Sequence, residues 1–116
     1  MSTPTKIDGT LFPRFPGELW ICLNGTAVDD SGWVDSSWAN SITIDVQGLA
    51  TGDVVSVHIS NSETKPLSSD HQLQAGNTIT SNTFVEIQLA PLWIKVRKTT
   101  AGGSPGTTTA KLLLRS

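Results

Sequence analysis

The sequence predicts an all-β fold: an antiparallel β-sandwich or jelly roll with an extended N-terminal arm. Segments in which apolar and polar residues alternate recur along the chain, and turn residues separate them. Apolar residues make up 37% of the chain and charged residues only 16%, so Thr, Ser, Gly and Asn fill the difference, as is typical of β-proteins with many turns. No long stretch combines the helical period with helix-forming residues. The length of 116 residues fits one domain.

The N-terminal segment, residues 1–17, is predicted to be an arm, and residues 18–116 are predicted to be the single sandwich domain. Pro4, Pro13 and Pro16 interrupt regular strand pairing in the arm. The arm also carries three large apolar side chains that a free tail would leave in water: Leu11, Phe12 and Phe15. They either cover an edge of their own sandwich or pack on a neighbouring subunit, and the sequence leaves both interpretations open.

The first half of the domain contains two predicted hairpins. Residues 18–23 form a strand, and the dipeptide Asn24-Gly25 that follows is a strong hairpin signal. Residues 29–40 form a polar loop that holds two tryptophans. Two alternating segments around a glycine turn predict a second hairpin over residues 41–59.

The second half begins with a polar connection, residues 60–70, which suits a crossover between sheets. Residues 71–80 hold a short strand. Residues 84–114 are predicted to form an antiparallel hairpin unit, in which a Gly/Ser/Pro loop at residues 99–106 is flexible. One face of this unit is expected to pack against the core, and the other is expected to face solvent.

The residue patterns that carry enzyme chemistry are missing from the sequence, so we expect no enzymatic activity, no metal site and no cofactor. Phosphate-binding and dinucleotide-binding glycine patterns and the nucleophile elbow are absent. The two histidines, His58 and His71, are far apart in sequence and are expected at the surface rather than as metal ligands. The aspartates of residues 29–35 lack the spacing of a calcium-binding loop.

The single cysteine, Cys22, lies in an apolar run and is predicted to be buried and unreactive. One cysteine cannot form an internal disulfide, which fits synthesis in a reducing cytoplasm. The first residues do not show the basic and apolar regions of a secretory signal, so we expect none.

The charge pattern argues against nucleic acid as a partner, and the apolar pattern argues against a membrane. The net charge is −2, and the densest basic cluster, Lys95, Arg97 and Lys98, is predicted to be a solvated sheet face or a charged edge. No apolar run approaches the roughly 20 residues that a spanning helix needs.

Aromatic side chains outside the predicted core are the best candidates for contacts with other molecules. Phe84 and Trp93 alternate out of register with the apolar residues of their strands and thus point away from the core. Together with the arm they form the predicted interface: Leu11, Phe12, Phe15, Phe84 and Trp93. Within one chain, the arm could instead cover Trp93. Trp33 and Trp38 are expected to form an exposed pair that stacks on sugar rings or docks into a partner.

The C-terminal segment LAPLWIKVRKTTAGGSPGTTTAKLLLR, residues 89–115, resembles the closing hairpin of small tailed-phage virion proteins. In these proteins an apolar strand near a proline and an Arg/Lys pair leads through a Gly/Thr loop into a Thr-rich last strand. Head-decoration and cement proteins are similar in having a β-sandwich body with an arm that ties neighbours together. The resemblance implies a non-enzymatic subunit, often a homotrimer, that clamps capsomers and assembles in the host bacterial cytoplasm.

We therefore expect a structural protein of a phage virion, most simply a capsid decoration or cement protein. Its expected partners are further copies of itself, with a trimer favoured, and the major capsid protein or another virion protein. The alternative is a carbohydrate-binding or receptor-binding domain of a tail fibre, with Trp33 and Trp38 as its stacking platform.

Overall fold

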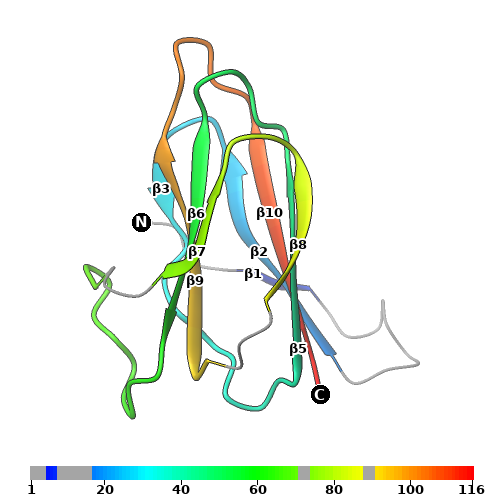
Figure 1. Cartoon of the computed structure of the whole chain (residues 1–116), viewed down its shortest axis with the longest axis vertical. Helices are drawn as coiled ribbons and strands as arrows, with labels where there is room; N and C mark the ends of the chain where they lie inside the picture. The colour runs from blue at the N-terminus through cyan, green and yellow to red at the C-terminus, as the bar shows by residue number, and fades with distance from the viewer. Residues whose placement is uncertain (1–4, 8–16, 71–73, 88–90) are drawn as a thin grey trace.

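The computed structural model describes residues 5–7, 17–70, 74–87 and 91–116, and these form two antiparallel sheets packed face to face (Figure 1). This confirms the predicted all-β sandwich. The described residues contain strands and turns but no helix. The strands are β1 (Thr5–Ile7), β2 (Gly17–Gly25), β3 (Asp29–Asp30), β4 (Val34–Asp35), β5 (Ser41–Gln47), β6 (Val54–Ser60), β7 (Gln74–Ile79), β8 (Thr83–Ile87), β9 (Trp93–Thr100) and β10 (Thr108–Arg115).

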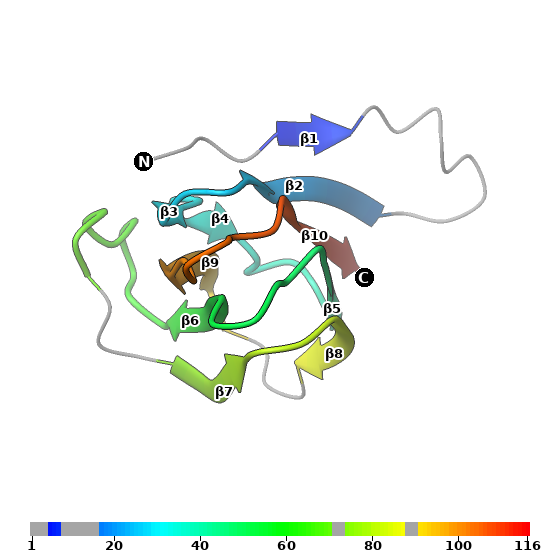
Figure 2. The same ribbon diagram turned by 90° about the horizontal axis from the view of Figure 1, so that it is seen from above.

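The strand order identifies the sandwich as a jelly roll. The first sheet, sheet A, has the order β1-β2-β10-β5-β8, and the second, sheet B, has the order β3-β9-β6-β7, with β4 also paired to β9 (Figure 2). With β1 set aside, the antiparallel pairs are nested: β2 with β10, β3 with β9, β5 with β8, and β6 with β7. A chain that folds back as one long hairpin and then rolls into two sheets gives this order, which defines a jelly roll.

The core lies between the sheets and follows the alternation in the sequence. In β5, Ile42, Ile44 and Val46 are buried, whereas the residues between them point outward. β10 repeats this pattern with alternate buried residues from Thr108 to Leu114. Each fully buried aliphatic side chain of this kind contributes about 1.5–3 kcal/mol relative to leaving it exposed, so the alternation fixes which side of each strand faces inward.

The predicted hairpins are wrong, because the strands that each hairpin would join lie in different sheets. β5 and β6, which residues 41–59 contain, lie in sheets A and B, and β8, β9 and β10 lie in sheets A, B and A. Gly25 ends β2 without the positive φ of a tight hairpin turn, and the chain continues to β3 in sheet B. Alternation predicts which side of a strand is buried, but the same pattern suits a partner in either sheet.

The predicted arm is partly a strand of the sandwich. β1 pairs antiparallel with β2 and is the outermost strand of sheet A. A boundary at residue 17 therefore separates two segments that share a sheet. Leu11, Phe12 and Phe15 lie outside the described residues.

Two loops that connect the sheets, residues 48–53 and 101–107, lie side by side at one end of the sandwich (Figure 1). The side chain of Asp53 is fully buried between them. Its carboxylate accepts backbone N–H hydrogen bonds of 2.8–2.9 Å from both loops: from Ala50, Gly102 and Gly106. The Gly-rich segment that the sequence predicts to be flexible is thus tied to its neighbour at two points.

Candidate functional site

The basic cluster of β9 is buried rather than solvated, which corrects the sequence prediction. Lys95 is fully buried, Lys98 is 1% exposed and Arg97 is half-buried. β9 lies between β3 and β6, so it is not an edge strand either. Lys98 points into the sandwich, where its Nζ donates to Thr108 Oγ1 at 2.8 Å and lies 3.6 Å from Asp53 Oδ2. Its charge is compensated inside the protein and cannot bind an external anion.

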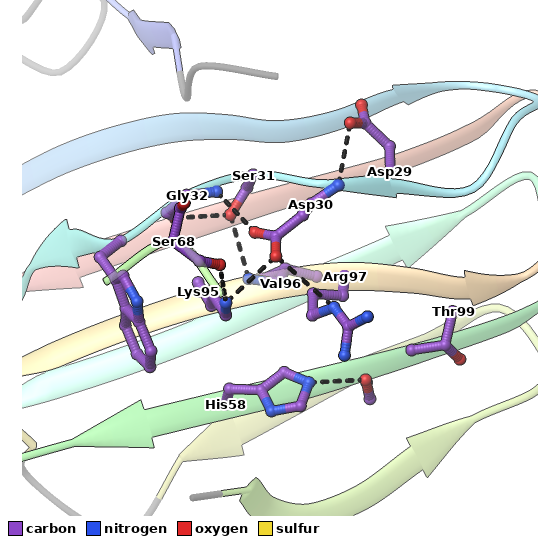
Figure 3. A network of polar contacts seen from close by, with 12 residues as sticks. Asp29, Asp30, Ser31, Gly32, His58, Ser68, Lys95, Val96, Arg97 and Thr99 are labelled. Atoms are coloured by element: carbon purple, nitrogen blue, oxygen red, sulfur yellow. Dashed lines mark hydrogen bonds and ion pairs between the residues drawn. The ribbon is translucent and has the colours of Figure 1, made fainter. Parts of the chain in front are cut away.

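Lys95 is the centre of a polar network on the outer face of sheet B (Figure 3). Its Nζ donates to Asp30 Oδ2 at 3.1 Å and lies 4.8 Å from the centroid of the Trp33 ring. The same Asp30 oxygen lies 3.5 Å from Arg97 Nε. Burial lowers the pKa of the Lys95 ammonium, and the hydrogen bond to Asp30 offsets part of this effect.

The network holds the loop of residues 60–70 in place. Three side chains donate to backbone carbonyls of this loop: Lys95 Nζ to Ser68 at 3.0 Å, Trp33 Nε1 to Leu67 at 3.0 Å, and Trp93 Nε1 to Ser62 at 3.0 Å. Because Lys95 and Trp33 are buried beneath the loop, they are closed to a substrate or ligand. Their role in this arrangement is to fix a loop.

His58 is fully buried, contrary to its predicted surface position. It lies two residues after Ser56 on β6, and the Oγ of Ser56 lies 3.0 Å from His58 Nε2. A serine beside a histidine has the residue types of a nucleophile and its base. Ser56 is only 5% exposed, however, so a substrate could not reach its hydroxyl. His71 lies outside the described residues.

The predicted exposed pair of tryptophans does not form. Trp33 is 5% exposed, because its indole packs under Lys95 and the 60–70 loop. Trp38 is 37% exposed and remains available for contact. The polar residues next to Trp33 in sequence did not indicate that it is buried, because the loop that covers it is 34 residues away in sequence.

The outer face of sheet A is the surface on which apolar and charged side chains meet in register. Four residues from the neighbouring strands β8, β5, β10 and β2 share one row, which we call the Phe84 row: Phe84, Asp45, Lys111 and Ile21. At the β2 end of this row, Ile21 pairs with Thr5 of β1. The next row, the Glu86 row, contains Glu86, Thr43, Leu113 and Leu19. In β5 and β10 these positions alternate with buried core residues, so they lie on the opposite side of the sheet from the core, and their register partners in β8 and β2 lie on the same side.

The exposure along these rows makes the face a candidate interface. The Phe84 side chain is 66% exposed, and Lys111 and Glu86 are exposed. Ile21, Leu19 and Leu113 are half-buried. Of the two predicted interface aromatics in the described residues, Phe84 is therefore strongly exposed, whereas Trp93 is half-buried and hydrogen-bonded to the 60–70 loop of its own chain.

The sequence contains a pattern that indicates the other apolar residues on the outer face of sheet A, and our prediction did not use it. Residues 19–23 and 112–114 are continuous apolar runs within strands. A strand with one wet face alternates, whereas an uninterrupted run indicates that both faces touch apolar surroundings. Leu19, Ile21 and Leu113 occupy the outward positions in these runs.

Within the described part of the chain, no group of three or more His, Cys, Asp or Glu side chains is placed to hold a metal ion. An open depression lies beside the turn between β7 and β8, lined by Thr78, Ile79, Thr80, Ser81, Thr83 and Val85. It contains no ionisable side chain. None of the described residues belongs to a helix that is long and apolar enough to cross a membrane.

Comparison of the chain with protein-family models, with curated proteins and with solved structures finds no match. The surfaces of the chain itself are therefore the basis for a functional proposal.

Proposed function

We propose that this chain is a non-enzymatic structural protein of a phage virion, a capsid decoration or cement subunit that stabilises the shell through contacts between subunits. The observation that carries the proposal is the outer face of sheet A, where Phe84 is 66% exposed beside half-buried aliphatic side chains. Apolar side chains on the side opposite the core are the usual basis of a protein interface.

Two further features support this proposal. The jelly roll is a common fold of viral capsid proteins, and it also occurs in lectins. Three buried charged side chains are engaged in holding the fold: Asp53 and Lys98 close one end, and Lys95 secures the 60–70 loop.

The proposed mechanism is the repetition of a modest contact. One sheet face supplies only a small apolar area, so a single contact would be weak. On a shell with many equivalent positions, each subunit engages neighbours at the same time, and the combined binding exceeds any single affinity.

Deletion of the gene in a phage that carries it tests this function. We expect purified wild-type particles to contain the chain in many copies, and particles without it to release their DNA at a lower temperature or on milder osmotic shock. Wild-type particles that lack the chain would contradict the proposal.

The second candidate is a carbohydrate-binding or receptor-binding domain of a tail fibre, and the exposed Trp38 is the observation that favours it. A single indole on a loop offers a smaller stacking surface than the predicted pair. Under this alternative, a glycan array shows binding that Trp38→Ala abolishes and Phe84→Ser does not. Under the structural proposal, no glycan binds.

A further inference from the structure

The Phe84 row is complementary to itself. From β8 to β2 it contains an aromatic residue, an acid, a base and an aliphatic residue: Phe84, Asp45, Lys111 and Ile21. Reading the row in the opposite direction places an apolar residue against each apolar residue and a base against each acid.

We infer that the outer face of sheet A binds a second copy of this chain, with the two faces related by a two-fold axis parallel to the strands between β5 and β10. Such an axis places Lys111 of each copy opposite Asp45 of the other, and Ile21 opposite Phe84. Two-fold contacts use the same patch on both subunits, so the patch must be complementary to itself. This inference rests on the proposed function, because it names the partner of the proposed contact surface.

The burial and charge of the described residues favour this occupant. The Phe84 side chain is 66% exposed and would contribute most of the apolar contact. The half-buried Ile21 of the other copy offers an aliphatic surface for it to pack against. Asp45 and Lys111 lie at the centre, where two opposite-charge pairs fix the register. Sheets that pack face to face cross at about 30°, so the axis bisects the strand directions of the two copies, and the central charge pairs stay aligned while residues farther from the axis move apart.

The size of the outer face of sheet A determines how strong the dimer is expected to be. Four strands about 4.8 Å apart and about seven residues long at about 3.3 Å each give a face of roughly 20 by 23 Å. This is at the lower end of specific interfaces, so the dimer is expected to be weak and to dissociate on dilution. Repetition on a shell would compensate for that weakness.

Charge reversal tests the two-fold arrangement. Sedimentation velocity over a range of concentrations should show a monomer–dimer equilibrium for the wild type. Asp45→Lys alone and Lys111→Asp alone should each weaken the dimer at least tenfold, because every contact occurs twice. An equimolar mixture of the two variants should regain dimers, since one copy then presents two lysines and the other two aspartates.

The mixture also shows whether a single variant loses the dimer through the contact itself or through reduced folding stability. Each single reversal places like charges on neighbouring strands of its own chain, which costs some stability. That repulsion persists in the mixture, so regained dimers report the contact between copies alone. Phe84→Ser should abolish the dimer, and Glu63→Lys, on the exposed 60–70 loop, should leave it unchanged.

A wild type that stays monomeric at millimolar concentration would overturn the inference, as would single variants that dimerise like the wild type or a mixture that stays monomeric. The proposed virion function is measured separately, by the copies of the chain in purified particles. A monomer that is still found in particles would remove the two-fold contact and leave the proposed function in place.

Discussion

The carboxylate of Asp53 and the ammonium group of Lys98 lie 3.6 Å apart, and both side chains are buried at the end of the sandwich where two connecting loops meet. Backbone N–H groups of Gly102, Ala50 and Gly106, together with the charge of Lys98, hold the pKa of Asp53 well below its usual range. The ionised carboxylate is thus part of the fold.

The stability of the protein should therefore fall in acid, in part through Asp53. A carboxyl group with a depressed pKa in the folded state stabilises fully above its unfolded pKa of about 4, and this contribution is lost as the pH falls towards the folded pKa. We expect Asp53→Asn to lower the free energy of unfolding at pH 7, and the difference from the wild type to shrink at pH 3. Urea denaturation of both proteins at pH 7 and at pH 3 measures the difference in the free energy of unfolding. Glu63→Gln, an exposed carboxyl-to-amide change, is the control, and a difference that does not depend on pH would contradict the account.

Removal of Lys95 should release the 60–70 loop. Lys95→Met keeps the aliphatic volume but leaves Asp30 and the Ser68 carbonyl without their buried donor. We expect a loss of about 2–3 kcal/mol in unfolding free energy and faster hydrogen exchange of the amides in residues 60–70. Lys65→Met, on the exposed surface of the same loop, should change neither quantity. Unchanged exchange in the Lys95 variant would mean that other contacts hold the loop.

The close contact between the two connecting loops should make Gly106 intolerant of a side chain. A Cβ at this position would collide with the Gly48 carbonyl, whereas a Cβ at Gly103 would meet nothing within 4 Å. Gly106→Ala should cost about 1–3 kcal/mol, and Gly103→Ala should stay within about 0.5 kcal/mol. Thermal unfolding of both variants measures the contrast. Equal melting temperatures would show that the loops can separate without cost.

Cys22 should be unreactive in the folded protein. Burial raises the pKa of its thiol to about 12, and a hydrogen bond with Ser31 acts in the opposite direction. The thiolate is the reactive form, so a thiol reagent at pH 8 should label the native protein only as fast as it unfolds, and at once in denaturant. Rapid labelling under native conditions would contradict the described burial.

The sequence was sufficient for the fold class and for the core sides of the strands, because period-2 alternation is a local property. Ile42, Ile44 and Val46 face inward as predicted. Strand pairing was not predictable in the same way, because the alternation of β5 suits a partner in either sheet. The nested jelly-roll order arises from contacts between residues far apart in sequence.

The candidate site was predictable only in part, for the same reason. Phe84 was identified as outward-facing from its place in an alternating strand, and it is 66% exposed. Its neighbours in the row come from three other strands, so the match between Asp45 and Lys111 becomes visible only with the register. Charge alone was misleading for Lys95, which is buried because a distant loop supplies its carbonyl partner.

The outer face of sheet A is, in our proposal, a contact surface that another polypeptide covers. The most direct test is the number of copies of the chain in purified particles, compared between the wild type and Phe84→Ser at matched expression and matched melting temperature. We predict many copies of the wild type and at least tenfold fewer of the variant. Equal incorporation of the two proteins, or particles without either, would contradict the claim.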